Sequence, residues 1–83
     1  MLTVDVRFVA GELTPGLSSG SYDIESGTTI RELISICESK CGSAVPEHHY
    51  KLMYPLFNGK PVPLDGILTN SGTLHLCRVV SGG

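Results

Sequence analysis

The sequence is poor in basic residues, in long apolar runs and in cysteines, and each shortage argues against a class of protein. Six lysines and arginines are scattered among eight acidic residues, so the net charge is −2 and no basic stripe is available for a nucleic-acid backbone. No segment approaches the ~20 apolar residues of a membrane-spanning helix. We therefore expect neither nucleic acid nor a membrane as a partner.

The cysteines and the first residues indicate where the protein resides. Cys37, Cys41 and Cys77 are odd in number and lack the spacing of a disulfide framework, as is usual for reduced thiols in the cytosol. Residues 1–8 alternate between apolar and polar and include Asp5, which is unlike a signal peptide. We expect a cytoplasmic protein.

The length of 83 residues is that of one domain with one modest core. A chain of this size buries roughly 60–65 % of the surface that it exposes when unfolded. This leaves little volume for a catalytic pocket, so a small binding, carrier or modifier module that works as a monomer is expected rather than an enzyme.

Local patterns predict two strands and then a helix in the first half of the chain. Residues 2–8 alternate as a half-buried strand, and a shorter strand is expected at 21–25 after a loop rich in glycine and serine. Thr29 and Glu32 have the spacing of a capping box, and Gly42 is a suitable helix end. The apolar face of this helix is formed by Ile30, Leu33, Ile34, Cys37 and Cys41.

The second half predicts three strands. Residues 50–57 are strand-like, with Pro55 indicating an edge or a bend. Asn58-Gly59 predicts a type I′ hairpin turn, 60–63 a short edge strand and 73–80 the last strand. The first and last strands are the most apolar, so they are expected side by side in the sheet centre, with the helix across one face. This order, ββαβββ, is that of an α+β protein with a β-grasp fold and a mixed sheet.

Three short stretches resemble ubiquitin. The residues TLHL (73–76) and the final Gly82-Gly83 stand at the same distances from the C-terminus as their ubiquitin counterparts, and FNGK (57–60) is similar to the ubiquitin turn between its third and fourth strands. The resemblance implies a ubiquitin-like β-grasp domain at 1–79 and a flexible diglycine tail at 80–83.

Other stretches are more similar to the prokaryotic branch of this superfamily. Ubiquitin has a basic tail, whereas RVVSGG (78–83) carries one charge, and NGKPVP (58–63) also departs from ubiquitin. Both stretches resemble the small archaeal modifiers and the sulfur carriers of thiamin and molybdopterin synthesis.

The resemblance implies a chemistry for the tail. In this superfamily an E1-like enzyme uses ATP to adenylate the terminal carboxylate, here that of Gly83, while the carrier itself binds no cofactor and no metal. Gly82 would provide clearance in a narrow channel because glycine lacks a Cβ. Val80 and Ser81 would form the flexible segment that leads to the glycines, and Arg78 would make a charge contact with the enzyme. A terminal Gly-Gly also arises by chance.

The resemblance also implies two surface sites. Leu56, His75 and Cys77 occupy the positions of ubiquitin's apolar recognition patch. The alternative is that Leu56 belongs to the core and that His75 is only a solvated surface residue. Lys60 aligns with a chain-linking lysine of ubiquitin, although an exposed turn lysine is usually only a solvated charge.

The cysteines and histidines could suggest a zinc site or a thiol catalyst. The spacing of Cys37, Cys41, His48, His49 and Cys77 matches no standard zinc motif, and helix-face cysteines commonly serve as small apolar residues. No residue is placed to orient a catalytic base. We favour neither interpretation.

Three functions remain open. The preferred one is a covalent modifier joined through Gly83 to target proteins. The second is a sulfur carrier with a thiocarboxylate at Gly83, which would deliver sulfur to a biosynthetic enzyme or to tRNA. The third is a non-covalent ubiquitin-like interaction domain, in which the glycines are incidental.

Overall fold

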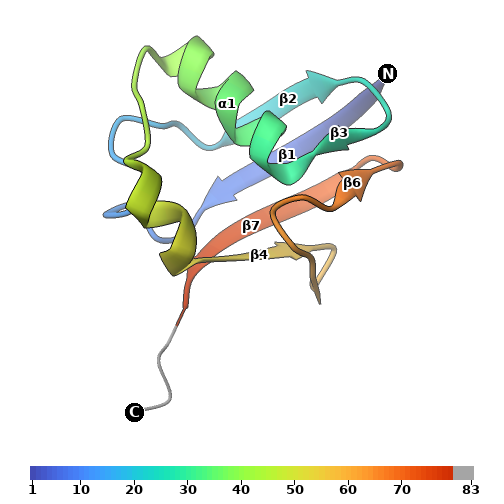
Figure 1. The fold of residues 1–83 in the computed structure, drawn as a ribbon. Helices are drawn as coiled ribbons and strands as arrows, with labels where there is room; N and C mark the ends of the chain where they lie inside the picture. The colour runs from blue at the N-terminus through green and yellow to red at the C-terminus, as the bar shows by residue number, and fades with distance from the viewer. Residues whose placement is uncertain (80–83) are drawn as a thin grey trace.

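A mixed five-stranded sheet with one α-helix across one face forms the protein (Figure 1). The structure is a computed structural model, and it describes residues 1–79. The strand order in the sheet is β2-β1-β7-β4-β5, and β3 pairs with β6 in a separate ribbon. The elements are β1 (Leu2–Phe8), β2 (Gly20–Ile24), β3 (Thr28–Thr29), α1 (Ile30–Cys41), the 3₁₀ helix η1 (Glu47–Leu52), β4 (Met53–Phe57), β5 (Lys60–Pro61), β6 (Ile67–Leu68) and β7 (Gly72–Arg78).

The first and last strands lie side by side in the sheet centre, as the sequence predicts, and they run parallel. The pairing of β1 with β7 extends from Val4 opposite Gly72 to Phe8 opposite Leu76. Because side chains alternate along a strand, this register directs one side of both strands toward α1. The side chains on that side, those of Val4, Val6, Leu74 and Leu76, are at most 1 % exposed.

The capping box at the start of α1 is confirmed. The Thr29 hydroxyl accepts from the Glu32 N–H at 3.1 Å, and the Glu32 carboxylate accepts from the Thr29 N–H at 2.9 Å. The helix ends at Gly42, whose φ of 69° lies in the left-handed region. Of the predicted apolar face only Cys41 is not fully buried, because it lies in the last turn.

The prediction of a strand over 50–57 is wrong in its first part. Residues up to Leu52 belong to η1, and β4 begins at Met53. Pro46 precedes η1 and accepts from the His49 N–H at 2.9 Å, which closes its first turn. Tyr50 then packs into the core at 6 % exposure, a tertiary contact that the local sequence does not reveal.

Of the two alternatives predicted for Pro55, an edge strand or a bend, the edge strand is wrong. Strand β4 is not an edge strand, because it lies between β7 and β5. The Pro55 carbonyl accepts from the Val62 N–H at 3.1 Å, so its backbone faces away from β7. The missing N–H of proline therefore removes no hydrogen bond between β4 and β7.

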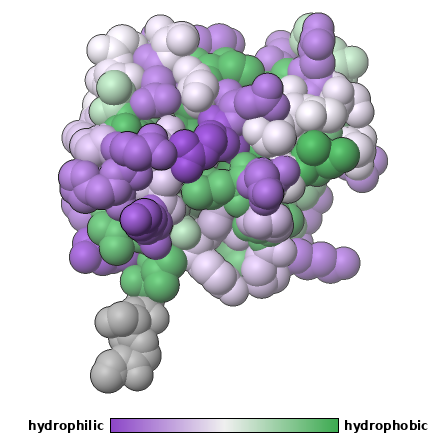
Figure 2. All heavy atoms as spheres, viewed as in Figure 1, coloured by the Kyte–Doolittle hydropathy of each residue, from purple (hydrophilic) through white to green (hydrophobic). Residues whose placement is uncertain are grey.

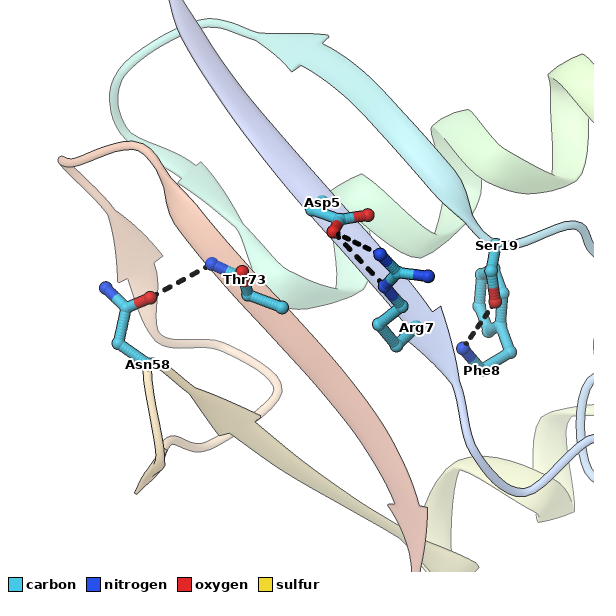
Figure 3. A network of polar contacts seen from close by, with 6 residues as sticks. All are labelled: Asp5, Arg7, Phe8, Ser19, Asn58 and Thr73. Atoms are coloured by element: carbon cyan, nitrogen blue, oxygen red, sulfur yellow. Dashed lines mark hydrogen bonds and ion pairs between the residues drawn. The ribbon is translucent and has the colours of Figure 1, made fainter.

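The predicted hairpin turn after β4 is confirmed. Asn58 and Gly59 both have positive φ, 52° and 83°, as a type I′ turn requires. The Asn58 side-chain oxygen accepts from the Thr73 N–H at 2.9 Å and so ties the turn to β7 (Figure 3). Gly72 lies directly beneath this amide, where a Cβ would collide with it.

Two short elements were not predicted. Strands β3 and β6 have two residues each, too few for an alternating pattern to be visible in the sequence. Their pairing places Thr28 opposite Leu68, and Leu68 is buried. In the part of the chain from 1 to 79, no helix has the length and apolar character needed to cross a bilayer.

Replacement of Thr29 by alanine should lower the free energy of unfolding by about 1 kcal/mol, because the Glu32 N–H loses its acceptor at the start of α1. Urea denaturation monitored by circular dichroism measures this change. Ser35→Ala, on the exposed side of the same helix, is the control and should be neutral or slightly stabilising. Equal effects of the two substitutions would contradict a specific capping role.

Candidate functional site

The face of the sheet opposite α1 brings two of the predicted site residues together. Leu56 of β4 lies directly across from His75 of β7, and Arg7 of β1 lies on the other side of His75. Leu56 and His75 are both half-buried. Figure 3 looks onto this outer face, where Asp5 and Arg7 project from β1 while α1 lies behind the sheet.

The next row on this face adds a residue that sequence reasoning missed. Cys77, the third residue of the predicted patch, pairs with Tyr54 of β4. The Tyr54 side chain is 44 % exposed, although it is a large aromatic residue. The alternation of Tyr54 with Leu56 along one strand was the signal that could have placed both on the same face.

The apolar surface continues to the end of β7. The Val79 N–H donates to the Leu52 carbonyl at 2.8 Å, and these side chains are 41 % and 37 % exposed. Figure 2 views the molecule from the helix side and shows hydrophobic spheres next to the last described residues, but not the outer face itself. We call the residues on the outer face the outer patch; it consists of Tyr54, Leu56, His75, Cys77 and Val79. Exposed apolar side chains that gather on one face are typical of a partner site.

An ion pair borders the outer patch. The Arg7 guanidinium contacts the Asp5 carboxylate at 2.8 Å, and both residues belong to β1 (Figure 3). The outer face therefore changes from apolar over β4 and β7 to charged over β1. A partner that covers the patch would meet Arg7 at its margin.

Arg78 ends β7 and points to a different segment. Its guanidinium lies 3.3 Å from the Glu12 carboxylate in the loop between β1 and β2. The backbone of Glu12 and the Arg78 guanidinium hold the pKa of this carboxyl below its usual range. Both side chains are more than half exposed, so the pair is screened by water and contributes little to stability. The predicted charge contact of Arg78 thus has an intramolecular competitor.

The remaining predicted site residues are of two kinds. Lys60 is exposed in β5, immediately after the hairpin turn, and no structural feature singles it out. Val80, Ser81, Gly82 and Gly83, the predicted lead and diglycine, lie outside the described residues.

The helix cysteines lie beside Tyr22, away from the outer patch. The Ser18 N–H points at the Cys41 sulfur from 3.4 Å, and this contact lowers the pKa of the Cys41 thiol. Burial raises the pKa of Cys37 to about 11. The Tyr22 hydroxyl lies 3.8 Å from the Cys41 sulfur. Nowhere between residues 1 and 79 do three histidine, cysteine or acidic side chains gather as metal ligands would.

The strand order, the parallel central pair and the helix across one face match proteins of known structure. The chain has the ubiquitin-like β-grasp fold. The sequence itself matches no protein-family model and no curated protein.

Three solved structures illustrate the likeness. A protein named as a molybdopterin converting factor subunit 1, from Pyrococcus furiosus, superposes with a TM-score of 0.65 at 17 % identity over 96 % of this chain and 100 % of its own. Small archaeal modifier protein 1 of H. volcanii gives 0.66 at 14 % identity over 96 % and 100 %. A design based on ubiquitin gives 0.62 at 23 % identity over 98 % and 92 %. At these identities the likeness establishes the fold.

Leu56 and Leu74 should respond differently to truncation. Leu74 is fully buried, so Leu74→Ala should cost about 2–5 kcal/mol of unfolding free energy. Leu56 faces outward and is only half-buried, so Leu56→Ala should cost about 1 kcal/mol or less. Chemical denaturation of both variants measures this. Similar losses would mean that Leu56 belongs to the core.

The two helix cysteines should differ in reactivity. Iodoacetamide at mildly alkaline pH should alkylate Cys41 readily, because thiolate is the reactive form and the lowered pKa increases its population. Cys37 should stay unmodified until the protein unfolds, since it is buried and its pKa is raised. Peptide mapping by mass spectrometry follows each site over time. Early labelling of Cys37 in folded protein would contradict the structure.

Proposed function

We propose that this protein is a ubiquitin-like modifier whose Gly83 carboxylate is activated by an E1-like enzyme and joined to lysines of target proteins. The observation that supports this most is the placement of Gly82-Gly83 shortly after β7, the central strand of a ubiquitin-like fold. The protein would be a cytoplasmic substrate and carrier, and the catalytic groups would belong to the activating enzyme.

The reaction begins with attack of the Gly83 carboxylate on ATP, which forms an acyl-adenylate and releases pyrophosphate. An enzyme thiol displaces AMP to give a thioester. A target lysine amine then attacks the carbonyl, so an isopeptide bond forms and the thiol is released. Glycine suits each step because the absence of a Cβ lets the nucleophile approach closely.

The outer patch is the surface that we assign to the activating enzyme. It reaches from Leu56 to Val79, so an enzyme bound there would hold the segment that leads to Gly83. Arg78 could leave Glu12 for an acidic group of the enzyme at little cost, because the ion pair is exposed. Lys60 is a candidate acceptor if the modifier forms chains.

A sulfur carrier is the second candidate. It is favoured by the RVVSGG ending and by the fold shared with the molybdopterin converting factor subunit. Here hydrosulfide, HS⁻, would attack the carbonyl of the same acyl-adenylate and displace AMP, leaving a thiocarboxylate on Gly83. A biosynthetic enzyme or a tRNA-modifying enzyme would then accept the sulfur.

Mass spectrometry of the protein isolated from its native source under denaturing conditions separates these functions. The intact mass first establishes whether Gly83 carries the terminal carboxylate. For a modifier, trypsin should cut after Arg78 and leave residues 79–83 as a branch on target lysines. For a sulfur carrier, the free protein should have one terminal oxygen replaced by sulfur.

Deletion of Gly82 and Gly83 should abolish both products. Lys60→Arg is the matched control and should retain attachment to targets, losing only chains built through that lysine. A plain carboxylate without any conjugate, under several growth conditions, would overturn both functions and favour a non-covalent interaction domain.

A further inference from the structure

A cleft on the helix side of the sheet has no role in the proposed function. It has a volume of about 510 Å³ and lies between the start of α1, the helix η1 and the loop that follows β5. Its lining residues are Arg31, Glu47, His48, Tyr50, Lys51 and Leu64.

The apolar part of the cleft is held in place by contacts with α1. The Tyr50 side chain is only 6 % exposed, and its hydroxyl lies 3.5 Å from the Glu38 carboxylate. The Arg31 guanidinium stacks 4.2 Å above the centre of the Tyr50 ring. The Leu64 carbonyl accepts from the Arg31 N–H at 2.9 Å, so this wall is fixed to the helix. The cleft is therefore formed before any ligand arrives.

The charged part of the cleft carries an excess of positive charge. Arg31 pairs with Glu47 at 3.1 Å, which uses one of the five N–H donors of a guanidinium. Lys51 makes no ion pair among the residues that the structure describes. The cleft thus presents a net positive site on a protein whose net charge is −2.

We propose that this cleft binds an acidic segment of a partner protein, in which carboxylates flank an apolar side chain. The carboxylates would pair with Arg31 and Lys51, since a guanidinium fork matches carboxylate geometry. The apolar side chain would lie against Tyr50 and Leu64. The mixed character of the lining, apolar walls beside two cations, fits such a segment better than a bare anion.

Two alternative ligands fit less well. A phosphate site at a helix start uses free backbone N–H groups, but those of Ile30 and Arg31 already donate to Gly66 and Leu64. An anionic membrane attracts broad polybasic surfaces, whereas this cleft contributes two cations to an acidic protein.

The site is separate from the surface proposed for activation. The cleft is built from α1 and η1, which lie on the other side of the sheet from the outer patch (Figure 1). An acidic partner could therefore bind while the outer patch and the chain end are engaged. The binding requires no covalent chemistry at Gly83, so it can be tested whatever the outcome for the tail.

NMR titration of the ¹⁵N-labelled full chain tests the proposal. The probe is a synthetic peptide in which aspartates and glutamates surround one leucine, and the control probe has lysines in place of the acids. The acidic peptide should produce saturable shifts at the amides of Arg31, Lys51 and Leu64. The lysine peptide should produce none there.

Substitutions at two exposed residues should change the affinity for the acidic peptide in opposite directions. Lys51→Gln removes a cation from the cleft and should weaken binding about two- to fivefold, as expected for one exposed ion pair. Glu47→Gln removes the carboxylate that competes for Arg31 and should strengthen binding by a similar factor. Lys40→Gln, which makes the same charge change elsewhere on the surface, should have no effect. None of these side chains lies in the core, so the variants should fold.

Several results would overturn the proposal. Shifts confined to the outer patch would place binding elsewhere, and equal weakening by Lys51→Gln and Lys40→Gln would indicate nonspecific charge attraction. Saturation of the same amides by inorganic phosphate alone would indicate a small-anion site. Binding to phosphatidylglycerol vesicles without binding to the peptide would indicate a lipid surface.

Discussion

The parallel pairing of β1 with β7 is the contact on which the rest of the structure depends. It joins the two ends of the described chain and so closes a long loop. The conformational entropy lost in this closure must be offset by the apolar surface that the pairing buries. Val6 and Leu74 are fully buried on the helix side of these strands. Without this pair α1 would have no apolar surface to cover, and β2 and β4 would lose the strands that they extend.

This central pair also separates two surfaces of different character. Because side chains alternate along each strand, the residues between the buried ones face away from α1. On β7 these are His75 and Cys77, and the register with β4 places Leu56 and Tyr54 beside them. On the helix side, α1 and η1 enclose the cleft at Arg31 and Tyr50. The pairing register therefore fixes the outer patch, and the sheet that it forms separates this patch from the cleft.

The candidate site was predictable only in part. Leu56, His75 and Cys77 were predicted together from the resemblance to ubiquitin; alternation along the last strand by itself only separates His75 and Cys77 from Leu74 and Leu76. Tyr54 was missed because the patch was taken from the resemblance to ubiquitin, although Tyr54 alternates with Leu56 along the strand predicted at 50–57. The contact of Arg78 with Glu12 and the cleft at Arg31 join residues far apart in the sequence, so no local pattern could indicate them.

Local chemistry in the sequence determined the first strand, the capped helix with its Gly42 end and the Asn58-Gly59 turn. Each depends on neighbouring residues, through alternation, a capping hydrogen bond or positive φ. The tertiary structure alone decided that Tyr50 belongs to a 3₁₀ helix, that Pro55 lies in an interior strand, and that two-residue strands pair as β3 and β6. In these cases burial and long-range hydrogen bonds outweigh local preference, because the free energy comes from partners distant in the sequence.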